Sequence, residues 1–261
     1  GTPQGVSPDY QRMNTSPDSS QNQAPVRPPV FWHLPARTPI VTYILIGLTV
    51  MAFLGQFISE AALGGDLLAA FGMKINSAIM QGEIWRLLTP MFLHGGLAHI
   101  AFNMYALFSL GVGLEKQYGH GRFLMLYLLG ALGGNTLSFL LTPSNSLGAS
   151  TAIFGLIAAE GVFIWKNRRM YRNPQKELVN VALIVGVNLF LGLGGGIDNF
   201  GHLGGLIAGI MFAWFAGPQW TGTVQPTGLH IIDQQRPGRM WLVGGLVALF
   251  WCVLAIVKMV G

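Results

Sequence analysis

Charged side chains are scarce in this sequence. Only 10% of its 261 residues are Asp, Glu, Lys or Arg, whereas 51% are hydrophobic, and the mean hydropathy is +0.50. A soluble protein of this length needs more charge to cover its surface. The composition therefore indicates a membrane protein, with the lipid bilayer as its solvent.

Cysteine is almost absent. Because Cys252 is the single cysteine, the fold cannot depend on an internal disulfide. We expect Cys252 to pack as a small hydrophobic side chain.

Three arrangements that carry out hydrolysis elsewhere are also missing. No His-Glu-x-x-His pattern, which would place two zinc ligands on one helix face, occurs in the chain. The nucleophile elbow of soluble hydrolases needs glycine two residues after its serine, and Ala152 stands in that place after Ser150. An aspartyl mechanism needs two carboxylates side by side in the membrane. All the aspartates instead fall in the expected tail or in connections: Asp9, Asp18, Asp66, Asp198 and Asp233. We therefore expect no metal and no cofactor, and serine chemistry remains.

The chain is basic, with a formal net charge of +5 and an isoelectric point near 9.6. Such a balance can indicate a nucleic-acid partner. Here the Lys and Arg residues are not interleaved with exposed aromatic residues, and their placement fits membrane topology instead. We expect no nucleic-acid partner.

Seven apolar runs are candidates for membrane helices, although several are short. They are Pro39–Ile58, Leu97–Leu114, Arg122–Leu141, Ser150–Trp165, Leu178–Leu193, Phe200–Phe215 and Trp241–Val257. In the sixth run, Gly201, Gly205 and Gly209 repeat at four-residue spacing, which lets a neighbouring backbone approach closely. The sequence thus predicts an all-α fold, a polytopic bundle of membrane helices.

The remaining segments divide the chain. Residues 1–30 are rich in Pro, Ser, Gln and Asn, which predicts a disordered cytoplasmic tail. Residues 31–216 would form a six-helix core, residues 217–240 a cytoplasmic linker, and residues 241–261 a seventh transmembrane helix. Between the first two runs, polar residues interrupt apolar pieces too short to span. That segment is expected on the membrane surface, or dipping into it under cover of protein.

The placement of Lys and Arg predicts the orientation. If the N-terminus is cytoplasmic, only Lys74, Arg86 and Lys258 fall outside. The other basic residues fall inside: Arg12, Arg27, Arg37, Lys116, Arg122, Lys166, Arg168, Arg169, Arg172, Lys176, Arg236 and Arg239. By the positive-inside rule, we expect a cytoplasmic N-terminus and a C-terminus outside.

With this orientation, several polar residues lie in the outer part of the membrane, at the start of the second, fourth and sixth runs. Polar groups at such a depth are costly and by default mark function or mutual hydrogen bonding. The residues are His94, His99, Asn103, Ser150 and His202.

Ser150 has two interpretations. It can be a helix N-cap, because serine oxygens often accept a hydrogen bond at a helix start. It can also be a nucleophile, which needs a base from elsewhere because a hydroxyl alone is weak. Helical spacing places His202 on a stripe with Gly205 and Gly209, so a serine on one helix can face a histidine on another.

The other polar residues have structural interpretations as well. His99 and Asn103 share a helix face and could join helices by hydrogen bonds, each worth roughly 1 kcal/mol. His202 alone could be a hydrogen-bonded packing residue. For His94 packing is favoured, because a five-residue separation points it away from His99.

Four further polar residues are expected to be structural. Asp198 and Asn199 precede the sixth run and would cap it. Glu115 would set the loop after the second run. Glu160 lies about 15 Å along the helix from Ser150 by its rise, and we expect it to partner Asn180 or Asn188 rather than to act as a triad acid.

Together these motifs resemble the rhomboid intramembrane serine proteases. The matching pieces occur in the family's order from about Pro39 to Phe215, and the helix from Trp241 resembles the six-plus-one arrangement. The pieces are Trp85-Arg86, the His94-x-x-x-x-His99-x-x-x-Asn103 pattern, Glu115, Gly148-Ala149-Ser150, and Gly201-His202-Leu203-Gly204-Gly205 with Gly209.

The resemblance implies the roles of these residues. Ser150 would be the nucleophile and His202 the general base, in a dyad without an acid. His99, Asn103 and the backbone N–H of Ser150 would form the oxyanion hole. The ring of Phe154 would pack on the catalytic imidazole. The remaining motif residues would support the site: Gly148, Gly205, Gly209, His94, Trp85 and Arg86.

The resemblance also implies an activity and its partners. The protein would cleave transmembrane segments of single-span membrane proteins, whose helices would reach the site laterally beside the fifth helix, under a cap formed by Gly192–Asp198. If the source is bacterial, it would be a multi-pass protein of the cytoplasmic membrane.

One position departs from the family's pattern. Thr151 stands where the family usually has glycine after the nucleophile. This departure keeps open a second interpretation, a non-catalytic rhomboid-like protein that binds membrane clients. A small-solute transporter is a third class, for which Glu160 alone is thin support.

Overall fold

The computed structural model describes residues 32–33, 37–194, 196–225 and 228–261. The tail expected at residues 1–30 lies outside the described residues. Long helices coincide with the expected runs to within about five residues. They are α1 (Ile40–Leu63), α4 (Leu97–Tyr118), α5 (His120–Leu141), α6 (Ser150–Lys166), α7 (Pro174–Gly192), α8 (Asn199–Ala216) and α9 (Arg239–Val260).

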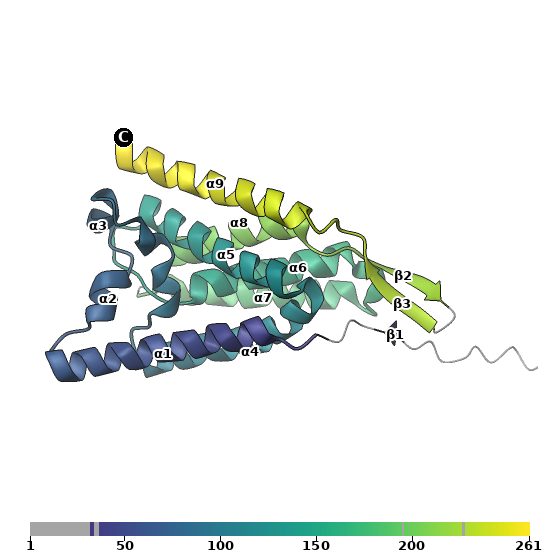
Figure 1. The fold of residues 1–261 in the computed structure, drawn as a ribbon, viewed down its shortest axis with the longest axis horizontal. Helices are drawn as coiled ribbons and strands as arrows, with labels where there is room; N and C mark the ends of the chain where they lie inside the picture. The colour runs from purple at the N-terminus through teal and green to yellow at the C-terminus, as the bar shows by residue number, and fades with distance from the viewer. Residues whose placement is uncertain (1–31, 34–36, 195, 226–227) are drawn as a thin grey trace, which may run out of the picture.

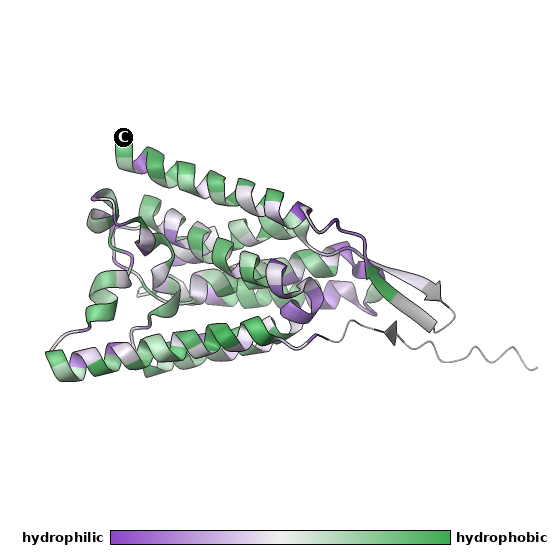
Figure 2. Ribbon diagram, in the orientation of Figure 1, coloured by the Kyte–Doolittle hydropathy of each residue, from purple (hydrophilic) through white to green (hydrophobic). Residues whose placement is uncertain are grey.

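These helices form the expected membrane bundle (Figure 1). Within the described ranges, six of them are long and apolar enough to cross a membrane, and α6 has 17 residues, at the short end of the spanning range. Hydrophobic residues run along the helices, while hydrophilic residues gather near the α6–α7 connection and the start of α9 (Figure 2). Many large apolar side chains are exposed, such as Phe102 and Phe190, which is the expected surface of a protein in lipid. Cys252 is also exposed on α9.

The connection between α1 and α4, expected on the outer side, consists of short helical segments: α2 (Leu67–Gly72), α3 (Asn76–Met80) and the 3-10 turns η3 (Ile84–Leu87) and η4 (Thr89–Phe92). Arg86 organises them from a buried position. Its guanidinium donates to the carbonyl oxygens of Met73 and Ala70 at 2.8 and 2.9 Å and pairs with Glu83 at 2.6 Å. Trp85 stacks on Phe71 at the surface, with ring centroids 5.3 Å apart. Both residues therefore support the connection.

Helix α6 is the centre of the bundle, and glycines of α5 and α8 bring those helices into direct contact with its backbone. A Cβ on Gly205 would overlap the carbonyl oxygen of Thr151, and one on Gly209 would overlap that of Gly155. The expected glycine stripe is thus the line along which the α8 backbone approaches α6.

Glu115 is buried near the C-terminal end of α4 and does more than set a loop. Its carboxylate accepts from the backbone N–H groups of Val41 and Thr42 at 2.9 and 2.7 Å and from the Thr42 hydroxyl at 2.6 Å. His120 lies 2.5 Å from the same carboxylate. Because the first N–H groups of a helix lack partners within it, Glu115 caps α1 and ties it to α4.

A small β-sheet, which was not expected from the sequence, has two of its three strands within the expected linker at 217–240. Strand β2 (Trp220–Gln225) pairs antiparallel with β3 (Gly228–Asp233), and β1 (Trp32–His33) pairs parallel with β3. The sheet lies at the end of the bundle opposite to α2 and α3 (Figure 1). Its sequence signal is the β-branched residues on either side of Gly228: Thr221, Thr223, Ile231 and Ile232.

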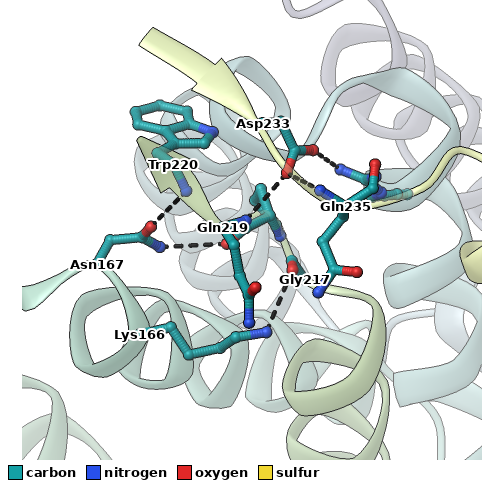
Figure 3. Close-up of polar contacts among 9 residues, drawn as sticks. Lys166, Asn167, Gly217, Gln219, Trp220, Asp233 and Gln235 are labelled. Atoms are coloured by element: carbon teal, nitrogen blue, oxygen red, sulfur yellow. Dashed lines mark hydrogen bonds and ion pairs between the residues drawn. The ribbon is translucent and has the colours of Figure 1, made fainter. Parts of the chain in front are cut away.

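Polar contacts anchor this sheet to the bundle (Figure 3). The Asn167 side chain, just after α6, accepts from the N–H of Trp220 at 2.8 Å. The Asp233 carboxylate accepts from the N–H groups of Gln219 and Gln235, both at 3.0 Å, and also pairs with Arg122 of α5. The hairpin is therefore attached to both α5 and α6.

We predict that Gly209→Ala destabilises the bundle, because the added methyl group forces α8 away from α6. We expect a loss of about 2 kcal/mol in the free energy of unfolding, as for other overpacked cores, measured by denaturant unfolding in detergent micelles. The matched control is Gly113→Ala, because nothing lies within 4 Å of a Cβ at that exposed position of α4. It should be neutral or slightly stabilising, and equal losses in the two variants would contradict the role of the close approach.

Candidate active site

Ser150 and His202 face each other at the N-terminal ends of two packed helices. Ser150 is the first residue of α6, and His202 lies in the first turn of α8. The Ser150 Oγ and the His202 Nε2 are 2.9 Å apart. His202 is only 6% exposed, while Ser150 is half-buried. The pair has the distance that proton transfer from a hydroxyl to an imidazole requires.

Ser150 is not the cap of its helix. The N-cap of α6 is Ala149, and no side chain forms a capping hydrogen bond at this end among the described residues. The capping interpretation is therefore wrong, because the serine lies one residue inside the helix and its hydroxyl bonds to the imidazole of α8.

Phe154 and its neighbours hold the imidazole of His202 in place. The two rings stack with centroids 4.1 Å apart and an interplanar angle of 10°. Phe154 lies on the α6 face of Ser150, one turn further along the helix. In the part of the chain that the structure describes, the His202 Nδ1 has no hydrogen-bond partner. Packing, rather than a carboxylate, orients this ring.

Gly148 shapes the turn that leads into Ser150. Its φ of 134° is a conformation that L side chains rarely adopt, and a Cβ there would lie 2.8 Å from the His99 Nε2. The N–H of Gly148 donates to the carbonyl oxygen of Pro90 at 2.9 Å. The absence of a side chain at this position thus lets His99 lie against the turn.

His99 is oriented with one nitrogen toward the site. The N–H of Gly95 donates to the His99 Nδ1 at 3.4 Å, so Nδ1 acts as the acceptor. In the tautomer assigned from this bond, Nε2 carries the hydrogen. A donor is therefore directed at the Gly148–Ser150 turn.

The prediction that His94 points away from His99 is wrong. Their ring centroids are 5.0 Å apart, because α4 begins only at Leu97 and helical spacing does not apply to His94. The N–H of Ala149 donates to the buried His94 Nε2 at 3.4 Å. Burial, and to a lesser degree His99, lower the pKa of His94 to about 4. His94 is therefore a neutral acceptor at pH 7 and packs against the turn that precedes Ser150.

Asn103 is buried one turn below His99, and its hydrogen bond is local. The side-chain Nδ2 donates to the carbonyl oxygen of His99 at 2.9 Å. Of the side chains expected in an oxyanion hole, His99 is the one whose contacts place it against the serine turn.

Thr151 fits its crowded position because two glycines make room for it. A Cβ on Gly134 of α5 would overlap the Thr151 Cβ, and one on Gly201 of α8 would lie 3.1 Å from its methyl group. The side chain is 5% exposed, and its hydroxyl has no hydrogen-bond partner among the described residues. The threonine thus fills the space between α5 and α8.

The remaining sequence expectations have mixed outcomes. Asp198 caps α8 as expected, accepting from the N–H of Gly201 at 2.9 Å, but Asn199 instead donates to the carbonyl oxygen of Leu189 at 3.0 Å. The expected partnership of Glu160 is wrong. Among the described residues it has no hydrogen bond to Asn180 or Asn188, and the latter bonds within its own helix to Ile184.

Lys74 was missed by the sequence analysis, which used it only for topology. The side chain is fully buried and donates to the Ser138 hydroxyl and the Thr142 carbonyl oxygen, both at 3.0 Å. A lysine in a connection between apolar segments carries no sequence signal for burial. Within the described ranges, no group of three or more His, Cys, Asp or Glu side chains could hold a metal ion.

An apolar cavity of about 380 Å³ lies between the C-terminal end of α7 and the first turn of α8, which also carries His202. Only Gly192 of α7 is buried, so this helix is loosely attached to the bundle. The cavity is lined by Leu189, Phe190, Leu193, Asn199, Phe200 and Leu203.

Comparisons with known proteins all relate this chain to rhomboid proteins. A family model described as the Rhomboid domain matches residues 81–219. The chain is 44% identical over 176 residues to "Rhomboid protease GluP" of Bacillus subtilis, covering 67% of this chain and 34% of that protein. It is 41% identical over 150 residues to "RHOMBOID-like protein 9, chloroplastic" of Arabidopsis thaliana, covering 57% and 35%. It is 39% identical over 149 residues to "Rhomboid-like protease 1" of Toxoplasma gondii, covering 55% and 51%. The chain thus spans about a third to a half of the length of these relatives.

We predict that Gly148→Ala lowers the reactivity of Ser150, because the new Cβ displaces His99 as well as straining the turn. The rate of covalent labelling by a fluorophosphonate should fall by about tenfold or more, in line with loss of one oxyanion-hole donor. Gly82→Ala is the matched control. It also strains the backbone at a φ outside the left-handed helical region, 99°, with nothing within 4 Å of the new Cβ, so labelling should stay unchanged. An equal fall in both variants would assign the effect to strain alone.

Proposed function

The chain belongs to the rhomboid family of intramembrane proteases, and on that premise we propose that it is a serine endopeptidase that cleaves transmembrane segments of other membrane proteins. The observation that carries the proposal is the 2.9 Å approach of the Ser150 Oγ to the His202 Nε2. A hydroxyl in contact with a buried imidazole has the base that it needs to become a nucleophile.

The proposed mechanism has two halves. His202 accepts the Ser150 proton as Oγ attacks the carbonyl carbon of the scissile peptide bond, and then gives it to the nitrogen of the leaving segment. In the second half, water takes the place of the leaving amine and attacks the carbonyl carbon of the ester to Ser150, while His202 accepts its proton. His202 then returns this proton to the Ser150 Oγ as the ester bond breaks, which releases the new carboxyl end and restores the free serine. Each half passes through a tetrahedral intermediate with a negatively charged oxygen.

We propose that His99 stabilises this oxygen together with the backbone N–H of Ser150. The close packing of His99 against Gly148 supports the assignment, since its Nε2 is directed at the turn. Asn103 would add a second side-chain donor, with the hydrogen of its amide that does not bond to His99. Donors held in advance at this position cost no reorganisation during the reaction.

A dyad without an acid is sufficient in this site because packing replaces the orienting carboxylate. The stack on Phe154 fixes the plane of the His202 ring, and Gly205 lets the first turn of α8 come against α6. The imidazole therefore has little freedom to leave the serine.

We propose that substrate helices approach beside α7. The sparse burial of this helix and the apolar cavity between α7 and α8 support this route, because an apolar segment can leave lipid there without meeting charge. The expected cap at 192–198 closes the outer side, with residue 195 outside the described residues. Single-span membrane proteins are the proposed partners.

The orientation remains the one predicted from Lys and Arg. The dyad lies at the end of the bundle with α2 and α3, and the basic α6–α7 connection lies at the end with the sheet (Figure 1). We therefore propose a cytoplasmic N-terminus, an outer C-terminus, and the expected division into tail, core, inner connection and seventh helix. Water would reach Ser150 from the outer side.

A non-catalytic, client-binding protein is the second candidate, and Thr151 is the observation in its favour. Its weight is reduced because Gly134 and Gly201 leave room for the Thr151 side chain, and the Ser150 hydroxyl keeps its 2.9 Å contact with His202. Labelling by a fluorophosphonate separates the two candidates, since only an activated serine reacts.

We predict that Ser150→Ala and His202→Ala each abolish cleavage of a model single-span substrate in proteoliposomes, because one removes the nucleophile and the other its base. Residual activity should lie at least about a thousandfold below the wild-type rate. Ser144→Ala, at an exposed position of the α5–α6 connection, is the control and should cleave normally. Undiminished cleavage by Ser150→Ala would overturn the mechanism.

We predict that His99→Ala lowers kcat by about 10²-fold with little change in KM, because the lost donor acts mainly in the transition state. Asn103→Ala should have a smaller effect in the same direction, since part of its hydrogen bonding is to its own helix. Steady-state kinetics with a fluorogenic single-span substrate measures both constants. A rise in KM with normal kcat would argue against an oxyanion role.

A further inference from the structure

Lys74 is the most unusual polar residue outside the catalytic pair. It lies between α2 and α3 in the first outer connection, yet its relative exposure is 0%. A buried ammonium group is costly unless hydrogen bonds and an opposite charge compensate it. Burial lowers the pKa of Lys74, and the nearby Asp198 opposes that change.

The ammonium group belongs to a closed ring of hydrogen bonds. Lys74 Nζ donates to the Ser138 hydroxyl at 3.0 Å, and that hydroxyl donates to the Asp198 carboxylate. Lys74 also donates to the Thr142 carbonyl oxygen at 3.0 Å, while the Thr142 hydroxyl donates to Asp198 at 3.3 Å. Ser138 and Thr142 therefore each connect the cation to the anion.

The ring joins two helix ends whose dipoles favour these charges. Ser138 and Thr142 are at the outer end of α5, where carbonyl groups lack partners and a cation is stabilising. Asp198 is the N-cap of α8, where an anion is stabilising. Its carboxylate accepts from the N–H of Gly201, and its carbonyl oxygen accepts from the N–H of His202 at 3.0 Å. The turn that carries the proposed base is thus bonded to the ring.

The backbone of Lys74 holds the other half of the site. It forms a two-way bridge with Ser146, with N···O distances of 2.9 and 3.2 Å. Ser146 lies in the α5–α6 connection, two residues before Gly148 and four before Ser150. Lys74 is therefore bonded through its backbone to the segment that leads into Ser150. Through Ser138 and Asp198 it is also bonded to the turn that carries His202.

We propose that Lys74 is a positioning residue of the proposed dyad, setting the approach of Ser150 to His202 through Ser138 and Asp198 on one side and through Ser146 on the other. The inference rests on the proposed function for its catalytic consequence. Without the ammonium group, Asp198 loses its compensating charge, and the first turn of α8 is free to shift relative to α6. A displacement of about 1 Å at a reacting pair can cost 10²-fold in rate.

The test compares Lys74→Met and Ser138→Ala with controls at exposed positions, Lys116→Met and Ser144→Ala. Ser138→Ala should lower kcat and the rate of fluorophosphonate labelling by about tenfold, and Lys74→Met by more, with KM within twofold of wild type. The double variant should be no worse than Lys74→Met alone, because both substitutions break the same chain of bonds. Both controls should match the wild type.

Hydrogen exchange of the segment 198–204 gives a readout that does not depend on catalysis. The exchange rate should increase at least about threefold in Lys74→Met and in Ser138→Ala, and it should stay unchanged in both controls. If the wild type neither cleaves nor labels, the proposed function fails while this measurement still decides the positioning role. If Lys74→Met does not fold, Ser138→Ala decides. The proposal would be overturned if Ser138→Ala had the kcat, labelling rate and exchange rate of the wild type, or if its KM alone changed.

Discussion

The structure depends on the direct contact of the α8 backbone with α6. At Gly205 and Gly209 no side chain lies between the two helices, so backbone atoms meet directly at these two positions. Helices in lipid gain stability from such close packing because lipid tails provide no hydrophobic driving force for association. The same contact brings the first turns of both helices together, and the 2.9 Å approach of Ser150 to His202 is its local consequence.

Once that contact exists, the polar groups at the bundle ends must find partners there, because lipid offers none. Glu115 satisfies the free N–H groups of α1 at the inner end. At the outer end, Arg86 satisfies carbonyl groups of the first connection, and Lys74 satisfies those of α5. Charged residues in this chain are few, and the buried ones tie together elements that the apolar helices alone would leave free to slide.

The sequence analysis was most accurate where structure depends on local composition. The helix ranges follow from runs of apolar residues, and α6 begins at Ser150 as expected. Prediction from the sequence failed where a residue's contacts depend on a segment from elsewhere in the chain. His94 was placed by helical spacing, although its helix begins three residues later, and Glu160 was assigned partners that lie on the exposed side of α7. The β2–β3 hairpin was missed because its short strands are stable only where Asn167 and Arg122 hold them.

By itself the sequence determined the solvent, the membrane helices and the glycine stripe on α8. These follow from hydropathy and spacing, which are properties of neighbouring residues. Ser150 and His202 were candidates by their position in apolar runs, and the family resemblance implied their roles. Tertiary structure alone decided that Ser150 is bonded to a histidine 52 residues away rather than capping its helix. It also decided that Gly134 and Gly201 make room for Thr151, and that Lys74 is buried between two helix ends. The reason is physical: burial and hydrogen bonding depend on which segments meet in space, and distant segments meet only in the folded bundle.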